Sequence, residues 1–228
     1  QSISRPDSVR RGAYVGLAIV IIVGASIVVL PNFYSDITYD GEYQVAVTID
    51  EHAEEHNRTY PENFVLSNWG YNRMYNYFVN GEAAGYGYAR SNYEPFLTST
   101  DPGGWYDRFD DRVGYIVIPS APAPEESTYT KLYSQLGAGA NSTAHYQAVH
   151  VKPGIRVFAV VDGAQLQVNG PENASVSAQT AIGITGGEQG QRLRYQRTGT
   201  ITNETATLRV AYPGEYQVQT STGATDTV

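Results

Sequence analysis

The chain has 228 residues, 41% of them hydrophobic, enough for one membrane segment and one or two folded domains. A formal net charge of −8 excludes a protein that binds nucleic acid by tracking its phosphates. The lack of cysteine excludes disulfides and thiolate metal sites.

The first predicted element is a membrane-spanning helix. Residues 13–30 are uncharged and almost wholly apolar, and a helix of this length just crosses a hydrocarbon core of about 30 Å. Three arginines in residues 1–12 precede it, so the positive-inside rule places that segment in the cytoplasm. We therefore expect a cell-membrane protein whose bulk is extracellular. The chain starts with Gln1 and not with Met, and the segment before the span reads as a short loop. We therefore expect the span to be the last of several. The alternative is a single-pass protein cut at an artificial or processing boundary.

Four glycosylation sequons follow the predicted span, on the side where a glycosylation machinery could reach them. Each is a candidate glycosylation site, and an unmodified surface asparagine is the alternative at each. The asparagines are Asn57, Asn141, Asn173 and Asn203.

Residues 40–57 have helical spacing and carry a histidine pair. His52 and His56 lie one helical turn apart, a spacing that could bind a metal. The order Glu-His-Ala-Glu-Glu-His differs from that of the zincin helix, and no third ligand is evident. We interpret this face as a solvated polar surface.

A strand, a turn and a helix follow in residues 64–81. The apolar run 64–67 predicts the first strand, Trp69 and Tyr71 lie in an aromatic turn, and residues 72–80 predict a helix. Sites in α/β folds lie just past the carboxyl ends of strands, which makes the turn a candidate site. The alternative is that these aromatic side chains belong to the core.

Residues 81–112 predict a glycine- and tyrosine-rich loop, then a helix at 89–97 that is interrupted at Pro95. A turn at 101–104 and a helical turn at 105–110 come next. Three clustered carboxylates in the last segment could hold a hard cation. Two neighbouring arginines favour a salt-bridged surface instead. The residues concerned are Asp107, Asp110 and Asp111, with Arg108 and Arg112.

The second half of the chain changes from α/β to mostly β. Residues 113–118 predict a strand of the buried parallel type, and residues 127–136 a capped helix. Strands are expected at 145–151 and 155–161. Short strands between Gly, Pro and Asn turns then predict a small β-sandwich, with a frayed end from residue 223. The later strands are expected at 164–168, 175–184, 193–200, 207–211 and 216–220.

Two histidines lie in the strand predicted at 145–151. His145 and His150 fall on opposite faces of a strand unless a bulge intervenes. We interpret both as structural. The predicted class is α+β, with a transmembrane helix at 13–30, an external α/β domain at 31–139 and a β-rich domain, the β-sandwich, at 140–228.

The block at residues 67–72, Ser-Asn-Trp-Gly-Tyr-Asn, resembles the Ser-Trp-Trp-Asp-Tyr-Gly block of oligosaccharyltransferase catalytic subunits. Trp69 and Tyr71 match that block, whereas Gly70 stands where the family has Asp. The order of the segments downstream is similar to that of salt-adapted archaeal members. The similar segments are Leu132–Leu136, His145-Tyr146, Arg156–Phe158, Gly163-Ala164 and Tyr212–Tyr216.

The resemblance implies the acceptor-recognition portion of a membrane glycosyltransferase, which transfers a glycan from a lipid-linked donor to protein asparagine. It implies that Trp69 and Tyr71 bind the acceptor and that Gly70 weakens or alters acceptor selectivity, as in a divergent or inactive paralogue. The catalytic carboxylates and the divalent metal of the family lie outside this segment, so no cofactor is expected in this chain. The implied partners are bilayer lipid, a lipid-linked glycan and a protein acceptor. The alternative function is a single-pass surface protein for adhesion or envelope structure.

Overall fold

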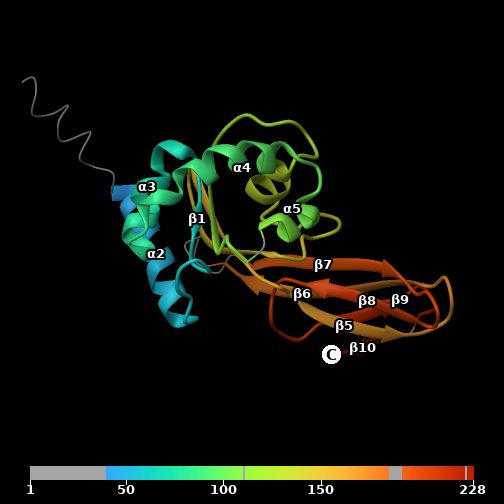
Figure 1. Ribbon diagram of the computed structural model, residues 1–228. Helices are drawn as coiled ribbons and strands as arrows, with labels where there is room; N and C mark the ends of the chain where they lie inside the picture. Colours follow the sequence, from blue (N-terminus) through green and yellow to red (C-terminus); the bar gives the residue numbers. More distant parts are fainter. Residues whose placement is uncertain (1–39, 110, 185–191, 224) are drawn as a thin grey trace, which may run out of the picture. The chain divides into compact units, whose positions relative to one another are not determined.

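A computed structural model describes residues 40–109, 111–184, 192–223 and 225–228 (Figure 1). The chain divides into two compact units, residues 1–44 and residues 45–228, and the account below concerns the second. The cytoplasmic segment and the transmembrane helix predicted at 13–30 lie outside the described residues. Within the described ranges, no helix is both long and apolar enough to cross a bilayer.

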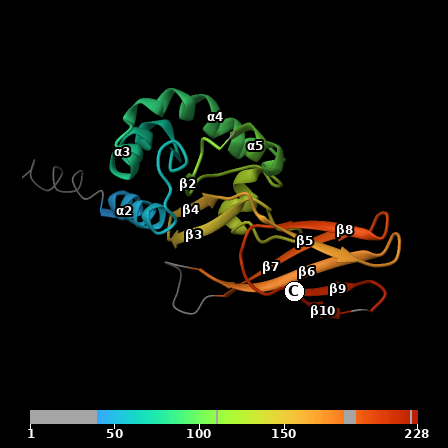
Figure 2. The same cartoon turned by 60° about the horizontal axis from the view of Figure 1, so that its bottom comes forward.

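The mixture of helices and sheets confirms the α+β class. The first part of the described chain contains a four-stranded mixed sheet. Strand β2 (Tyr115–Pro119) runs parallel to β1 (Val65–Leu66) and antiparallel to β4 (Ile155–Val160). The parallel pairing predicted for residues 113–118 is therefore present on one side of β2 only. The last two strands form an antiparallel hairpin, visible in Figure 2. The order across the sheet is β1 (Val65–Leu66), β2 (Tyr115–Pro119), β4 (Ile155–Val160) and β3 (Tyr146–Lys152).

Both faces of this sheet are buried, which explains why its two central strands, β2 and β4, are apolar at most successive positions. In β2, Tyr115 and Val117 enter one core while Ile116 and Ile118 enter the other. The first of these cores includes residues of α2 and α3, and the second includes residues of α4, α5 and η2. The helices are α2 (Asp40–Glu55), α3 (Trp69–Asn80), η1 (Ala83–Gly85), α4 (Tyr86–Thr98), α5 (Pro102–Phe109) and η2 (Thr130–Ser134), which is π-helical.

The β3–β4 hairpin belongs to a different sheet from the one that the sequence predicts. They follow residue 140, where the sequence predicts a separate β-rich region, yet they complete the sheet that β1 and β2 begin. The physical reason lies in the two faces of β4. Val157 and Ala159 pack into one core, and Phe158 and Val160 into the other, so only a sheet covered on both sides can bury this strand.

Several helix boundaries differ from the sequence prediction. The helix α3 begins at Trp69, so the predicted aromatic turn is its first turn. The helix α4 continues through Pro95 to Thr98, so this proline costs one hydrogen bond to the preceding turn but does not end the helix. The helix α5 begins at Pro102, a favourable first helical position, and the Asp101 carboxylate accepts the Gly104 N–H at 3.0 Å.

The remaining strands form two sheets that share one hydrophobic core, whose buried members include Val176, Tyr195 and Leu208. The end of the chain, expected to fray, pairs with a neighbouring strand. Backbone bonds between Tyr216 and Val228 extend this pairing, at 2.7 and 3.0 Å. The four-stranded sheet has the order β10 (Thr225–Thr227), β9 (Gln217–Thr220), β6 (Ser175–Gly183) and β7 (Arg192–Thr200), and the two-stranded sheet pairs β5 (Ala164–Asn169) with β8 (Thr205–Val210).

Candidate functional site

The candidate site lies at the start of α3, and asparagine side chains tie this helix to strand β1. β1 is an edge strand with a neighbour on one side only. On its other side, the Asn76 Oδ1 accepts the Val65 N–H at 2.9 Å, and the Asn76 Nδ2 donates to the Val65 carbonyl at 2.9 Å. The Asn72 Nδ2 donates to the same carbonyl at 2.7 Å. Two side-chain amides thus take the place of a neighbouring strand and satisfy buried backbone groups.

The same row of amides continues along the helix. The Asn80 Nδ2 donates to the Asn76 Oδ1 at 3.0 Å and to the Asn63 carbonyl at 3.3 Å. Asn72, Asn76 and Asn80 are spaced by four residues, so they lie on one face of α3. We call these three residues the asparagine row. It holds α3 against β1 and thereby positions the first helical turn.

The start of the helix is defined by Asn68, whose side chain accepts the Gly70 N–H at 3.0 Å. Asparagine is among the strongest N-cap residues because its oxygen satisfies an otherwise unpaired helix N–H. Trp69 and Tyr71 follow directly and are 58% and 40% exposed. The alternative that these two rings belong to the core is therefore wrong, although Tyr75, farther along the helix, is buried.

A pocket of about 180 Å³ lies beside Trp69, with α4 as its second wall. Arg90 and Glu94 are exposed residues of α4 that line it and bring a cation and an anion to its rim. Tyr93 lies deeper. Its hydroxyl donates to the Val117 carbonyl at 2.9 Å, and burial raises the pKa of Tyr93. Arg90 and Glu94 were not identified from the sequence, because only the packing of α4 brings them next to Trp69.

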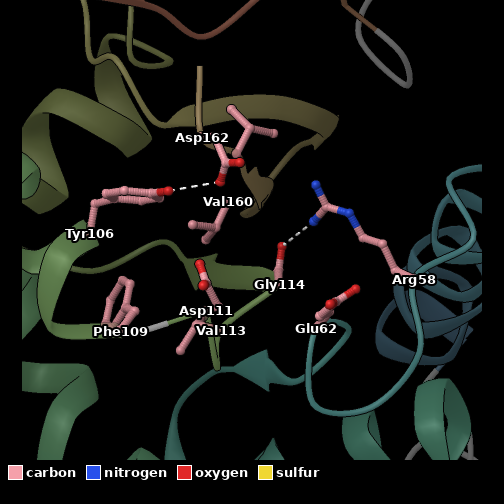
Figure 3. Close-up of a pocket in the computed structure, with 10 residues that line it drawn as sticks. Arg58, Glu62, Tyr106, Phe109, Asp111, Val113, Gly114, Val160 and Asp162 are labelled. Atoms are coloured by element: carbon pink, nitrogen blue, oxygen red, sulfur yellow. Dashed lines mark hydrogen bonds between the residues drawn. The ribbon is translucent and has the colours of Figure 1, made fainter. Parts of the chain in front are cut away.

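A second, larger cavity of about 390 Å³ lies near the other end of β1 (Figure 3). Its lining includes Arg58 and Glu62, which precede β1, and Asp162, which follows β4. None of these three was identified as a site residue from the sequence. They come from separate segments that only the sheet brings together.

The four sequon asparagines are all exposed. Asn57, Asn173 and Asn203 have positive φ angles of 53°, 63° and 54°, typical of asparagine in turns. Asn141 differs, because its Oδ1 accepts a hydrogen bond from the Arg197 guanidinium at 3.1 Å. Their glycosylation stays a prediction.

The histidine pair on α2 lies on a face that is mostly exposed, as expected, and only His52 is half-buried. The His52 Nδ1 lies 2.8 Å from the Tyr115 hydroxyl, and the His52 ring stacks on His56 with centroids 4.1 Å apart. Burial, followed by the charges of His56 and Arg58, lowers the pKa of His52 to about 4. Within the described ranges, no three His, Asp or Glu side chains form a group that could hold a metal.

The arginines expected to form salt bridges near α5 lie over aromatic rings instead. The Arg108 guanidinium is 4.3 Å from the ring centroid of Trp105, and that of Arg112 is 4.2 Å from Tyr88. Cation–π attraction to the aromatic rings thus stabilises the two guanidinium groups. Of the three clustered carboxylates, Asp110 lies outside the described residues.

The two histidines near β3 have structural surroundings. His145 stacks on Tyr106 with centroids 3.7 Å apart, and its Nδ1 lies 3.0 Å from the Val161 carbonyl. His150 is buried on β3. The pairing of β3 with β4 shifts between Ala148 and His150, so the bulge that would change which face each histidine occupies is present.

Comparison with known proteins gives matches among solved structures only. No family model and no curated protein matches the sequence. Archaeal oligosaccharyltransferase AglB from Archaeoglobus fulgidus, in complex with an inhibitory peptide and a dolichol-phosphate, matches with a TM-score of 0.54 and 11% identity. That match covers 72% of this chain and 35% of the other. An Archaeoglobus fulgidus oligosaccharyltransferase tethered to an acceptor peptide containing the NVT sequon matches with a TM-score of 0.52 and 12% identity, over 72% and 36% of the two chains.

At such low identity these matches establish a likeness of fold and nothing finer. The chain spans about a third of the length of the oligosaccharyltransferase chains that it matches. The resemblance to the archaeal oligosaccharyltransferase family is thus matched at the level of the fold. The described part of the chain has a fold like that of part of the archaeal oligosaccharyltransferase.

Proposed function

We propose that this chain is the external acceptor-recognition portion of a membrane glycosyltransferase resembling oligosaccharyltransferase, which transfers a glycan from a lipid-linked donor to protein asparagine. One observation carries the proposal. Trp69 and Tyr71 are exposed on the first turn of a helix that the asparagine row holds against β1, in a fold like that of the archaeal enzyme.

The surroundings of Trp69 suit an extended peptide. An exposed indole offers an apolar face for stacking and one N–H donor. Beside it, Glu94 can accept a hydrogen bond from a side-chain hydroxyl, and Arg90 can donate one to a peptide carbonyl. Gly70 lacks the carboxylate that the family has at this position, so in our proposal Glu94 is the nearest group of the same chemistry in this pocket.

Transfer from a lipid phosphate needs a divalent metal to stabilise the charge on the leaving phosphate. The described residues do not fit such an ion, because no three potential ligands come together among them. In our proposal the metal and the catalytic carboxylates belong to other parts of the enzyme. The part of the chain described here binds and orients the acceptor.

The proposal includes the membrane. Residues 13–30 would span the bilayer with residues 1–12 in the cytoplasm, and the two folded regions, including the C-terminal β-sandwich, would lie outside the cell. The lipid-linked glycan and the protein acceptor would be the partners. The peptide and dolichol-phosphate in the structurally similar AglB complex support this choice of partners.

The test uses membranes that contain the native protein and an acceptor peptide with an Asn-x-Thr sequon. Trp69→Ala should abolish glycan transfer and leave the protein folded. Tyr77→Ala is the matched control, because Tyr77 is 64% exposed on the same helix but does not line the pocket. Transfer by Trp69→Ala at the wild-type rate contradicts the acceptor role. An immunoblot showing a native polypeptide of only 228 residues favours the single-pass surface protein instead.

A further inference from the structure

The cavity of about 390 Å³ is separate from the pocket beside Trp69. Glu62 precedes β1 whereas Trp69 follows it, so the two hollows lie at opposite ends of this strand. Two further residues that line the larger cavity, Gly114 and Val160, lie at the same end of the sheet as Glu62. Gly114 precedes β2, and its carbonyl accepts the N–H of Val160, the last residue of β4, at 2.8 Å.

The lining brings together groups that only accept hydrogen bonds and a group that only donates them. Figure 3 shows the carboxylates of Glu62, Asp111 and Asp162 and the guanidinium of Arg58 around the hollow. Arg58 donates to the Gly114 carbonyl at 3.1 Å. Glu62 and Asp111 accept no side-chain hydrogen bond from another described residue, so both carboxylates can bind a ligand.

Tyr106 and Asp162 form a fixed part of the wall. The Tyr106 hydroxyl donates to the Asp162 Oδ1 at 2.8 Å, and one face of the Tyr106 ring stacks on the His145 ring. Burial and the nearby Asp162 raise the pKa of Tyr106 to about 12, so the hydroxyl stays protonated at neutral pH. Its oxygen keeps a lone pair for a ligand hydroxyl.

The charges of the lining narrow the class of ligand. Cavities of this size fall in the range of small-molecule sites, but most such sites are apolar, and the polar lining here calls for a hydrophilic ligand. Three carboxylates against one guanidinium repel a phosphate or a carboxylate. The Arg58 guanidinium in the same wall weakens the site for a simple cation.

A neutral ligand with several hydroxyls avoids both conflicts, because each hydroxyl can donate to a carboxylate and accept from Arg58. We propose that this cavity binds a saccharide unit through Glu62, Asp111, Asp162 and Arg58. The buried side chains of Phe109, Val113 and Val160 give it an apolar wall for the C–H face of a sugar ring. This binding site is independent of the acceptor pocket and of glycan transfer.

The test measures binding of the methyl glycosides of glucose, galactose, mannose and N-acetylglucosamine to the full chain by saturation-transfer difference NMR. At least one of them should bind, and Asp111→Asn and Glu62→Gln should each weaken its binding by at least about tenfold. Both changes remove a charge at nearly constant shape. Asparagine also tolerates the positive φ of 56° at residue 111.

Glu125→Gln is the matched control, because Glu125 is exposed and lies outside the cavity. It should bind the saccharide as the wild type does, and so should Trp69→Ala. Circular dichroism confirms that each variant is folded. Failure of all four glycosides to bind overturns the proposal, as does binding that Asp111→Asn and Glu62→Gln leave unchanged. Binding of spermidine that the same two variants abolish, without saccharide binding, makes the cavity a cation site and also overturns it.

Discussion

The Asn76 side chain binds the backbone of Val65 as a neighbouring strand would. Its Oδ1 accepts the Val65 N–H and its Nδ2 donates to the Val65 carbonyl, both at 2.9 Å. Edge strands present unpaired backbone groups, which other chains can bind. A helix here covers the edge and satisfies its polar groups, and the same contact places Trp69 just past the strand.

Asn76→Leu should destabilise the protein by about 2–4 kcal/mol, because it leaves a buried N–H of Val65 without a partner and removes further bonds of the asparagine row. Chemical denaturation monitored by circular dichroism measures the change. Asn92→Leu serves as the control, since Asn92 makes one hydrogen bond, to the Tyr88 carbonyl, from a partly exposed position. Equal losses in the two variants would show that the contact with Val65 has no special weight.

Glu94→Gln should lower glycan transfer by about three- to tenfold, if the chain recognises the acceptor as proposed. A carboxylate accepts a hydrogen bond from a sequon hydroxyl more strongly than an amide oxygen does. Steady-state transfer to peptides that carry Thr or Ala two residues after the asparagine measures the effect. The loss should be confined to the Thr peptide.

Glu82→Gln is the control for this experiment, because Glu82 is exposed and does not line the pocket beside Trp69. It should leave transfer to both peptides unchanged. An equal loss on the Thr and Ala peptides in Glu94→Gln argues against a contact between Glu94 and the hydroxyl.

His52 should make the protein less stable in acid. Its pKa in the folded protein is about 4, below its ordinary value of 6.5, so the unfolded chain takes up the proton first as the pH falls. The stabilising contribution is complete above about pH 6.5 and is lost as the pH falls to 4. Because the ring is half-exposed, solvent screening reduces the effect to the order of 1 kcal/mol.

Denaturation of wild type and His52→Gln between pH 7.5 and 4 tests this expectation. The variant should show a smaller loss of stability over that range. Some dependence should remain, since burial also lowers the pKa of His145 and of His150. An undiminished pH dependence in His52→Gln would place the titrating group elsewhere.

Much of the local structure follows from residues near one another in the chain. The apolar run before Ser67 predicted β1, and the spacing in residues 40–57 predicted the helix α2, which ends at Glu55. The predicted starts of α3 and α5 were wrong because the residue that caps each helix was not recognised. Asn68 and Asp101 each bind an N–H inside the helix that follows, so both predicted turns are helix starts.

The sequence by itself determined the class of the fold, most of the helices and strands, and the two aromatic residues of the proposed acceptor site. These depend on the spacing of apolar residues and on short motifs. Only the tertiary structure decided that β3 and β4 join the first sheet, that the asparagine row binds Val65, and that Arg58 and Asp162 line one cavity. These contacts join residues far apart in the chain, and they form because the two faces and the edge of one sheet must be covered together.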